Sequence, residues 1–290
     1  MVNFGYELVK VCEEKNMSIW EYTLEDEAKE SGLSKEAVFE KMRQNLKVMQ
    51  EAAEYGMKNE VISVSGLIGG DGYKLSRYAE SGNTLTGKMM MKAMARALSC
   101  SEVNASMGRI VAAPTAGSCG IMPATIITAG EELGKSDDDL VKALFTASGV
   151  GIIIAKNATM AGAEGGCQAE CGSAAAMAAA AVVEMMGGTP DQALNAAAIV
   201  FKNILGLVCD PVAGLVEIPC AKRNASGTVS ALTTADMVMG GVMSKIPFDE
   251  TVEAMYKIGK GMPCALRETA QGGVAITETG LKMQEKVFGK

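Results

Sequence analysis

The stretch that most restricts the fold of this chain is residues 167–186, which read CQAECGSAAAMAAAAVVEMM. It is an almost unbroken run of small and apolar residues, and such residues let neighbouring backbones approach closely. The run therefore predicts a buried central helix whose first residue, Cys167, lies at a buried helix N-terminus. That position lowers the pKa of a thiol and favours the thiolate.

The rest of the chain predicts helices as well. Of its 290 residues 48% are hydrophobic, and only 4% are aromatic, so alanine, glycine and methionine carry the apolar content. Apolar residues recur at helical spacing and few runs alternate, which predicts an all-α fold. We expect a single compact helical domain with buried Ala/Gly-rich central helices and long functional loops. Its parts are an N-terminal helical arm, 1–60, and a body, 61–290, that carries the functional loops. Helices are expected at 3–15, 18–31, 35–57, 85–100, 136–155, 167–186, 190–205, the segment ending near 239, 249–262 and 279–288.

Two absences exclude whole classes of function. The chain has no histidine, which removes the commonest general base and every histidine-containing zinc site. The net charge of −7 argues against binding to nucleic acid or to an anionic membrane. Residues 110–130 are uncharged, but Pro114 and Pro123 interrupt them, so we expect a buried loop and helix rather than a membrane span. Without a recognisable signal peptide we expect a cytoplasmic protein, in which the eight cysteines are thiols or metal ligands.

Two of these cysteines bound the segment CDPVAGLVEIPC, from Cys209 to Cys220. Pro211 follows the first cysteine closely and Pro219 precedes the second, so both ends of the loop are stiff. A stiff loop with two thiols suits a soft metal or an iron–sulfur cluster. Buried cysteine is also a common core residue, and the loop alone leaves both interpretations open.

Three further loops contain candidate functional residues. Between Pro114 and Pro123, the small residues around Thr115 and Ser118 form a backbone that an anion can approach. In residues 61–74 the pair Gly69-Gly70 breaks the helix, we expect Asp71 to cap the next one, and Lys74 follows about one turn later. Arg267 precedes another glycine pair, Gly272-Gly273. A plain interhelical loop or a solvated turn is the alternative interpretation of these segments.

Four motifs together resemble the α subunit of the iron–sulfur-dependent L-serine dehydratases: NASMGRIVAAPTAGSCG, AGAEGGCQAE, GLVCDPVAGLVEIPCAKRNA and ALRETAQGGVA. The resemblance covers essentially the whole chain. It implies a [4Fe–4S] cluster held by Cys167, Cys209 and Cys220, with one iron lacking a cysteine ligand. It also implies a separate β subunit, which related single-chain enzymes carry fused. Three positions depart from the family pattern: Cys171 stands where we expect valine, and Cys119 and Cys264 where we expect residues without a thiol.

The expected reaction is the conversion of L-serine to pyruvate and ammonia, with the open iron as Lewis acid on the substrate hydroxyl. Lys74 is the best candidate base in this chain, while the resemblance places a histidine base on the β subunit. Thr115, Ser118 and Arg267 are candidates for binding the substrate carboxylate or supporting the cluster. Two alternatives remain open: another cluster-dependent lyase, such as a cysteine desulfidase, and a non-catalytic iron–sulfur redox sensor or electron carrier. The preference between serine and threonine is also open.

Overall fold

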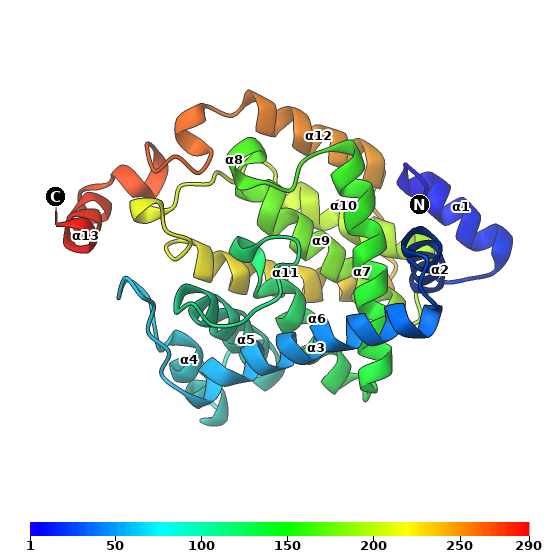
Figure 1. Ribbon diagram of the computed structural model, residues 1–290, viewed down its shortest axis with the longest axis horizontal. Helices are drawn as coiled ribbons and strands as arrows, with labels where there is room; N and C mark the ends of the chain where they lie inside the picture. The colour runs from blue at the N-terminus through cyan, green and yellow to red at the C-terminus, as the bar shows by residue number, and fades with distance from the viewer. Residues whose placement is uncertain (290) are drawn as a thin grey trace.

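The computed structural model describes residues 1–289 and shows helices joined by loops (Figure 1). Within that range there is no strand; the backbone forms two isolated bridges, Ile62 with Gly69 and Cys209 with Arg267. The predicted all-α fold is confirmed. The α-helices are α1 (Gly5–Lys15), α2 (Ile19–Ser31), α3 (Lys35–Lys58), α4 (Asp71–Glu80), α5 (Gly87–Ala105), α6 (Ile121–Glu132), α7 (Asp137–Asn157), α8 (Gly162–Gly165), α9 (Cys167–Met185), α10 (Pro190–Ile204), α11 (Cys220–Met239), α12 (Phe248–Gly261) and α13 (Glu278–Phe288). The short 3-10 helices are η1 (Ala116–Ser118), η2 (Val212–Gly214), η3 (Cys264–Leu266) and η4 (Gly273–Ile276).

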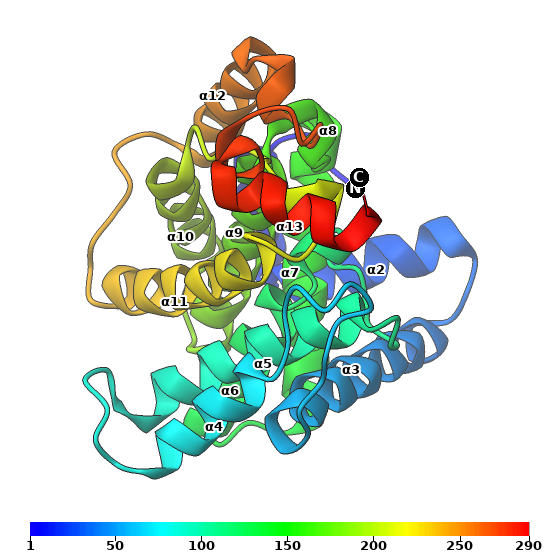
Figure 2. The same cartoon turned by 90° about the vertical axis from the view of Figure 1, so that its left-hand side faces the viewer.

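The alanine-rich helix α9 lies in the middle of the molecule, with α6, α7, α10 and α11 packed against it (Figures 1 and 2). Every residue of α9 is buried except Glu170 and Glu184. The surrounding helices also cross closely. A Cβ atom on Gly227 of α11 would lie 2.6 Å from the Cδ1 atom of Ile121 in α6. The predicted buried central helix is confirmed, and small side chains are the reason that it can be covered on all sides.

The first three helices pack onto this core, α2 on α7 and α3 across α5 and α7. The half-buried Glu184 of α9 attaches α2, because its carboxylate accepts hydrogen bonds from the backbone N–H groups of Ile19 (2.6 Å) and Trp20 (3.3 Å). These donors have no partner within their own helix, so the carboxylate satisfies them. The division into an arm, 1–60, and a body, 61–290, stays a prediction.

Two helix starts that the sequence predicts are confirmed. The Ser136 hydroxyl accepts from the backbone N–H of Asp139 at 3.3 Å, as a capping box requires. The Thr189 hydroxyl caps α10, and Pro190 is the first helical residue. The uncharged segment 110–130 consists of a loop, η1 and most of α6, and no helix within residues 1–289 has both the length and the apolar character needed to cross a bilayer.

The expectation that Asp71 caps α4 is wrong. Gly70 precedes the helix and Asp71 is its first residue, with its carboxylate 2.5 Å from Nζ of Lys222. The cap comes from Glu102 of α5, which accepts from the N–H groups of Asp71 (2.6 Å) and Gly72 (3.4 Å). These donors are satisfied by Glu102, which lies on another helix. No local sequence motif could therefore predict the cap.

Burial raises the pKa of the Glu102 carboxyl from 4.5 to about 7. Because the folded chain binds this proton more tightly than the unfolded chain, the free energy of unfolding falls as the pH rises through that interval. We expect Glu102→Gln to remove this loss, since an amide oxygen still accepts a hydrogen bond without carrying charge. The gain at pH 8 should be about 3 kcal/mol.

Urea unfolding of both chains at pH 5 and pH 8 measures the effect. The matched control is Glu285→Gln, which changes an exposed glutamate on α13. If the free energy of unfolding changed with pH by the same amount in the wild type and in Glu102→Gln, the assignment of this charge to the buried cap would be contradicted.

Candidate metal centre

The start of α9, and with it Cys167, is fixed by the fully buried amide of Gln168. Its Nε2 atom donates to the carbonyl oxygens of Gly165 (2.9 Å) and Met255 (3.0 Å), and its Oε1 atom accepts from the N–H of Gly206 (2.8 Å). These partners belong to α8, to α12 and to the turn after α10. Both polar atoms of this buried amide are paired, so its hydrogen bonds favour one arrangement of the three segments. In that arrangement they meet next to Cys167.

Cys209 lies in the turn between α10 and η2 and pairs with the backbone of the loop that follows α12. Its N–H donates to the carbonyl oxygen of Leu266 at 2.8 Å, and its own carbonyl accepts from the N–H of Glu268 at 2.7 Å. This bridge places Arg267 beside Cys209. The motif near residue 267 and the cysteine loop are therefore one structural unit, although more than fifty residues separate them.

The next residue, Asp210, is buried and anchors the same unit. Its carboxylate accepts from the guanidinium of Arg223 (2.9 Å) and from the N–H of Val274 (2.8 Å). Arg223 also donates to the carbonyl oxygen of Val208 at 2.8 Å. Gly273 has a φ of 60°, and a Cβ there would collide with Asp210, so only glycine fits this approach.

Cys220 is the first residue of α11, and Asn224 one turn later connects it to the loop around η1. The Asn224 Nδ2 atom donates to the carbonyl oxygens of Gly117 (2.7 Å) and Cys220 (2.9 Å). Its Oδ1 atom accepts from the N–H of Gly120 at 2.8 Å. Asn224 is 1% exposed, and none of its hydrogen-bonding capacity is left unused. The loop 115–120 is thereby held against the start of α11.

Three cysteines that the sequence separates lie in one region. Cys167, Cys209 and Cys220 are all buried, and none forms a disulfide. The Cys209 thiol is 3.9 Å from a carboxylate oxygen of Glu170, one turn into α9. A Cβ on Gly162 would lie 3.1 Å from the Cys209 sulfur and 2.5 Å from that carboxylate, so glycine keeps this space free.

The thiols influence one another's pKa. Burial, and next the charges of Glu170 and Cys167, raise the pKa of Cys209. Burial and the charge of Cys167 raise the pKa of Cys220 to about 12. The pKa of Cys167 is lowered, chiefly by its side-chain hydrogen bond with Cys171, with help from the positive charge of Arg223. A metal ion that binds the thiolates would reverse the effect of burial.

The donors at this site are of the kind that hold an iron–sulfur cluster, because cysteine thiolates are its usual protein ligands. Within residues 1–289 no three His, Cys, Asp or Glu side chains are arranged to hold one ion. In a cluster each thiolate binds a different iron, so the sulfurs need not converge on one point. Beside Cys209, the buried Nε atom of Arg267 finds no acceptor among residues 1–289, which leaves a donor free for a bound group.

Thr115, Ser118 and Arg267 lie beside these cysteines. Ser118 is fully buried, and its hydroxyl is 3.1 Å from that of Thr115. Burial raises the pKa of Glu170, while the neighbouring Thr115 hydroxyl opposes the rise. A Cβ on Gly117 would lie 3.3 Å from the Glu170 carboxylate. The loop 115–118 and the cysteine loop therefore share Glu170 as a neighbour.

Lys74 lies apart from this group. Its side chain is 69% exposed, and its Nζ atom is 3.4 Å from the carboxylate of Asp71. Its hydrogen bond to Asp71 is the one that its ammonium group makes within residues 1–289. The structure gives Lys74 no contact with the cysteines, and its role as a base stays a prediction.

Sequence reasoning missed four side chains that build the site: Glu170, Asp210, Arg223 and Asn224. Glu170 left a signal, because it is a charged residue within the alanine-rich run that predicts burial. The other three left none, since their partners are distant in sequence.

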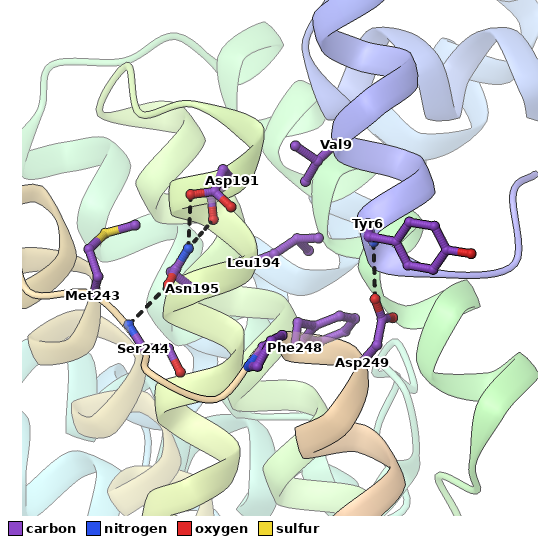
Figure 3. Close-up of a pocket in the computed structure, with 10 residues that line it drawn as sticks. Tyr6, Val9, Asp191, Leu194, Asn195, Met243, Ser244, Phe248 and Asp249 are labelled. Carbon is purple, nitrogen blue, oxygen red and sulfur yellow. Dashed lines mark hydrogen bonds between the residues drawn. The ribbon is translucent and has the colours of Figure 1, made fainter.

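A separate surface hollow of about 330 Å³ lies between α1, α10 and the start of α12 (Figure 3). No cysteine lines it. Its polar groups are paired with one another: Asp249 accepts from the N–H of Tyr6 at 3.0 Å, and Asn195 accepts from the N–H of Ser244 at 3.0 Å. We interpret this hollow as the joint that attaches α1 to the body.

Comparison with known proteins bears on the group of cysteines. Residues 14–275 match the family model described as "Serine dehydratase alpha chain". This chain belongs to the serine dehydratase alpha chain family. It is 50% identical over 283 residues to the probable L-serine dehydratase alpha chain of Bacillus subtilis, covering 98% of this chain and 94% of that one. It is 49% identical to the L-serine dehydratase alpha chain of Peptoniphilus asaccharolyticus, over 98% of this chain and 97% of the relative.

Some relatives of this chain are longer. The L-serine dehydratase of Streptomyces coelicolor is 37% identical over 280 residues, which are 94% of this chain but 60% of that protein. The longer protein therefore has further sequence that this chain does not match. The resemblance read from the four motifs is confirmed at the level of the family.

We expect Asp210→Ala to release the loop 264–276 from the Cys209 turn, because the change removes the acceptor for both Arg223 and Val274. Leaving Arg223 buried without its partner should also cost about 3–5 kcal/mol in the free energy of unfolding. Hydrogen–deuterium exchange, followed by peptide, measures the local effect. Asp236→Ala, at an exposed position of α11, is the control. Unchanged protection of residues 264–276 would contradict the anchoring role of Asp210.

Proposed function

We propose that this chain is the catalytic subunit of an L-serine ammonia-lyase, which converts L-serine into pyruvate and ammonia. One observation supports the proposal most: three buried thiols from separate segments gather near Glu170 in a chain of the serine dehydratase alpha chain family. Relatives that match nearly the full length carry the name L-serine dehydratase. Serine rather than threonine is our proposed substrate on the same ground.

We propose that Cys167, Cys209 and Cys220 hold a [4Fe–4S] cluster, for which cysteine thiolates are the usual protein ligands. Three thiolates for four irons leave one iron without a cysteine. When bound, such a cluster supplies a Lewis acid that makes the substrate hydroxyl a better leaving group. We do not include Cys171 in the ligand set, since Cys167 occupies the position of the family motif.

The other residues at the site are suited to binding the amino acid. The hydroxyls of Thr115 and Ser118 and the unpaired Nε donor of Arg267 are groups that bind a carboxylate. We propose that they orient the carboxylate of serine beside the thiols. Glu170 borders the same region, and burial raises the pKa of its carboxyl group.

The reaction requires a base. The Cα proton and the Cβ hydroxide leave serine to give an aminoacrylate, whose imine form reacts with water to release ammonia and pyruvate. This chain contains no histidine, and Lys74 is exposed and paired with Asp71. We therefore propose that a β subunit binds this chain and contributes the base. The extra length of the Streptomyces coelicolor relative is compatible with such a part fused to the alpha chain.

We also propose that the protein works in the cytoplasm. None of the eight cysteines forms a disulfide within residues 1–289, as expected in a reducing compartment.

The ligand assignment predicts that Cys167→Ala, Cys209→Ala and Cys220→Ala each abolish bound iron and serine turnover, because each removes one bond to the cluster. Iron and sulfide content, visible absorption and pyruvate formation are measured on anaerobically purified protein. Cys12→Ala and Cys100→Ala are matched controls, since both residues are buried but outside the ligand set.

Full iron content in Cys167→Ala, Cys209→Ala or Cys220→Ala would contradict the ligand assignment. Turnover of L-cysteine in place of L-serine by the wild type would favour a desulfidase. Spectra that do not respond to serine, together with no lyase activity in the presence of a β subunit, would favour a redox sensor.

The partner prediction concerns the isolated chain. After anaerobic reconstitution it should form pyruvate about 10²–10⁴-fold more slowly than when mixed with the β subunit, the range expected for a missing general base. The assay is pyruvate formation with and without the β subunit. Lys74→Met serves as the comparison, and it should leave the activity of the mixed enzyme unchanged. Robust turnover by the isolated chain, lost in Lys74→Met, would place the base on this chain.

A further inference from the structure

The thiols of Cys167 and Cys171 are in direct contact. The Cys167 thiol donates to the Cys171 sulfur at 3.3 Å, and both residues are almost fully buried, at 2% and 1% exposure. They are four residues apart on α9, a spacing that places side chains on one face of a helix. Ideal helix geometry separates their Cα atoms by about 6 Å, inside the range of about 4.4–6.8 Å that a disulfide spans.

No other buried cysteines within residues 1–289 form such a pair. The Cys119 thiol donates to the carbonyl oxygen of Cys100 at 3.7 Å rather than to a sulfur, and the hydrogen bonds of residues 1–289 include none from Cys12 to another thiol. Cys264 is exposed and distant in sequence from the others. The proposed function gives Cys171 no role, although it touches one of the three proposed ligands.

We propose that Cys171 is a resolving thiol that protects Cys167 from irreversible oxidation when its sulfur is not bound to iron. The chemistry rests on the thiol contact alone, and only its benefit, the preservation of a cluster ligand, rests on the proposed function.

The oxidant is hydrogen peroxide. The Cys167 thiol and peroxide give a sulfenic acid and one water. The adjacent Cys171 thiol then attacks the sulfenic sulfur, a sulfur–sulfur bond forms, and a second water leaves. The two thiols lose two electrons in total and peroxide gains them. A thiol reductant reverses the bond by exchange and returns both cysteines to the thiol form.

Burial determines which oxidants can act. A small molecule such as hydrogen peroxide can reach a thiol with 2% exposure, whereas oxidised glutathione is too large to attack it directly. Without the Cys171 sulfur, the sulfenic acid has no thiol within hydrogen-bond contact among residues 1–289 and proceeds to the sulfinic acid, which thiol reductants do not reverse.

The test uses the full-length chain, freed of iron with a chelator under anaerobic conditions and then treated with hydrogen peroxide. After denaturation, free thiols are alkylated with one label, disulfides are reduced, and the released thiols receive a second label. Mass spectrometry reads the label at each cysteine. Cys167 and Cys171 should both carry the second label, and Cys12 should carry the first.

Cys171→Ser and Cys171→Val are the two test variants; the first retains the size of the side chain and the second its apolar character. In both, Cys167 should gain about 32 Da, the mass of the two oxygens of a sulfinic acid. Cys12→Ala is the matched control and should behave like the wild type. After reduction, the wild type should recover iron binding and both variants should lose it.

Two results would overturn the proposal. One is that Cys171 of the wild type carries the first label, and so is a free thiol, although Cys167 is oxidised. The other is Cys167 that stays as reducible in both variants as in the wild type. Neither readout requires serine turnover, so a failure of the proposed enzyme activity would leave the label pattern interpretable.

Discussion

The structure depends on one requirement: α9, a helix built almost entirely of small residues, must be covered on every side. α9 achieves this by packing closely against α6, α7, α10 and α11, and the same packing brings its first residue next to the start of α11 and the turn after α10. Cys167 and Cys220 are the first residues of their helices, where the helix dipole favours negative charge. The packing of the core therefore brings these buried thiols into one region.

Buried polar side chains then fix the loops that packing alone would leave free. Gln168, Asp210 and Asn224 each join two or three segments through short hydrogen bonds, and each is almost fully buried. An unpaired buried polar group costs about 1–3 kcal/mol, so such a network favours one arrangement over all others. The cysteine loop, the loop 115–120 and the loop 264–276 are positioned in this way, which explains how three motifs far apart in sequence contribute to one region.

The sequence predicted the structure correctly wherever the determining residues are close to one another in the chain. The all-α class, the buried helix at 167–186, and the starts of α7 and α10 follow from composition, periodicity and capping residues, and all are confirmed. The predicted cap of α4 was wrong, because Glu102 of another helix accepts the hydrogen bond from its first N–H group. Asp210, Arg223 and Asn224 were missed for the same physical reason: tertiary contacts create their roles. Thr115, Ser118 and Arg267 lie beside the cysteines, but their roles, like the ligand assignment, stay predictions.

The central claim is that this chain holds a cluster with one iron free to meet the substrate. Mössbauer spectroscopy tests it most directly, on chain reconstituted with the Mössbauer-active iron isotope and mixed with the β subunit. The account predicts that L-serine changes the isomer shift and quadrupole splitting of one iron site and leaves the thiolate-bound sites as they were. A spectrum of equivalent irons that serine does not alter would contradict it.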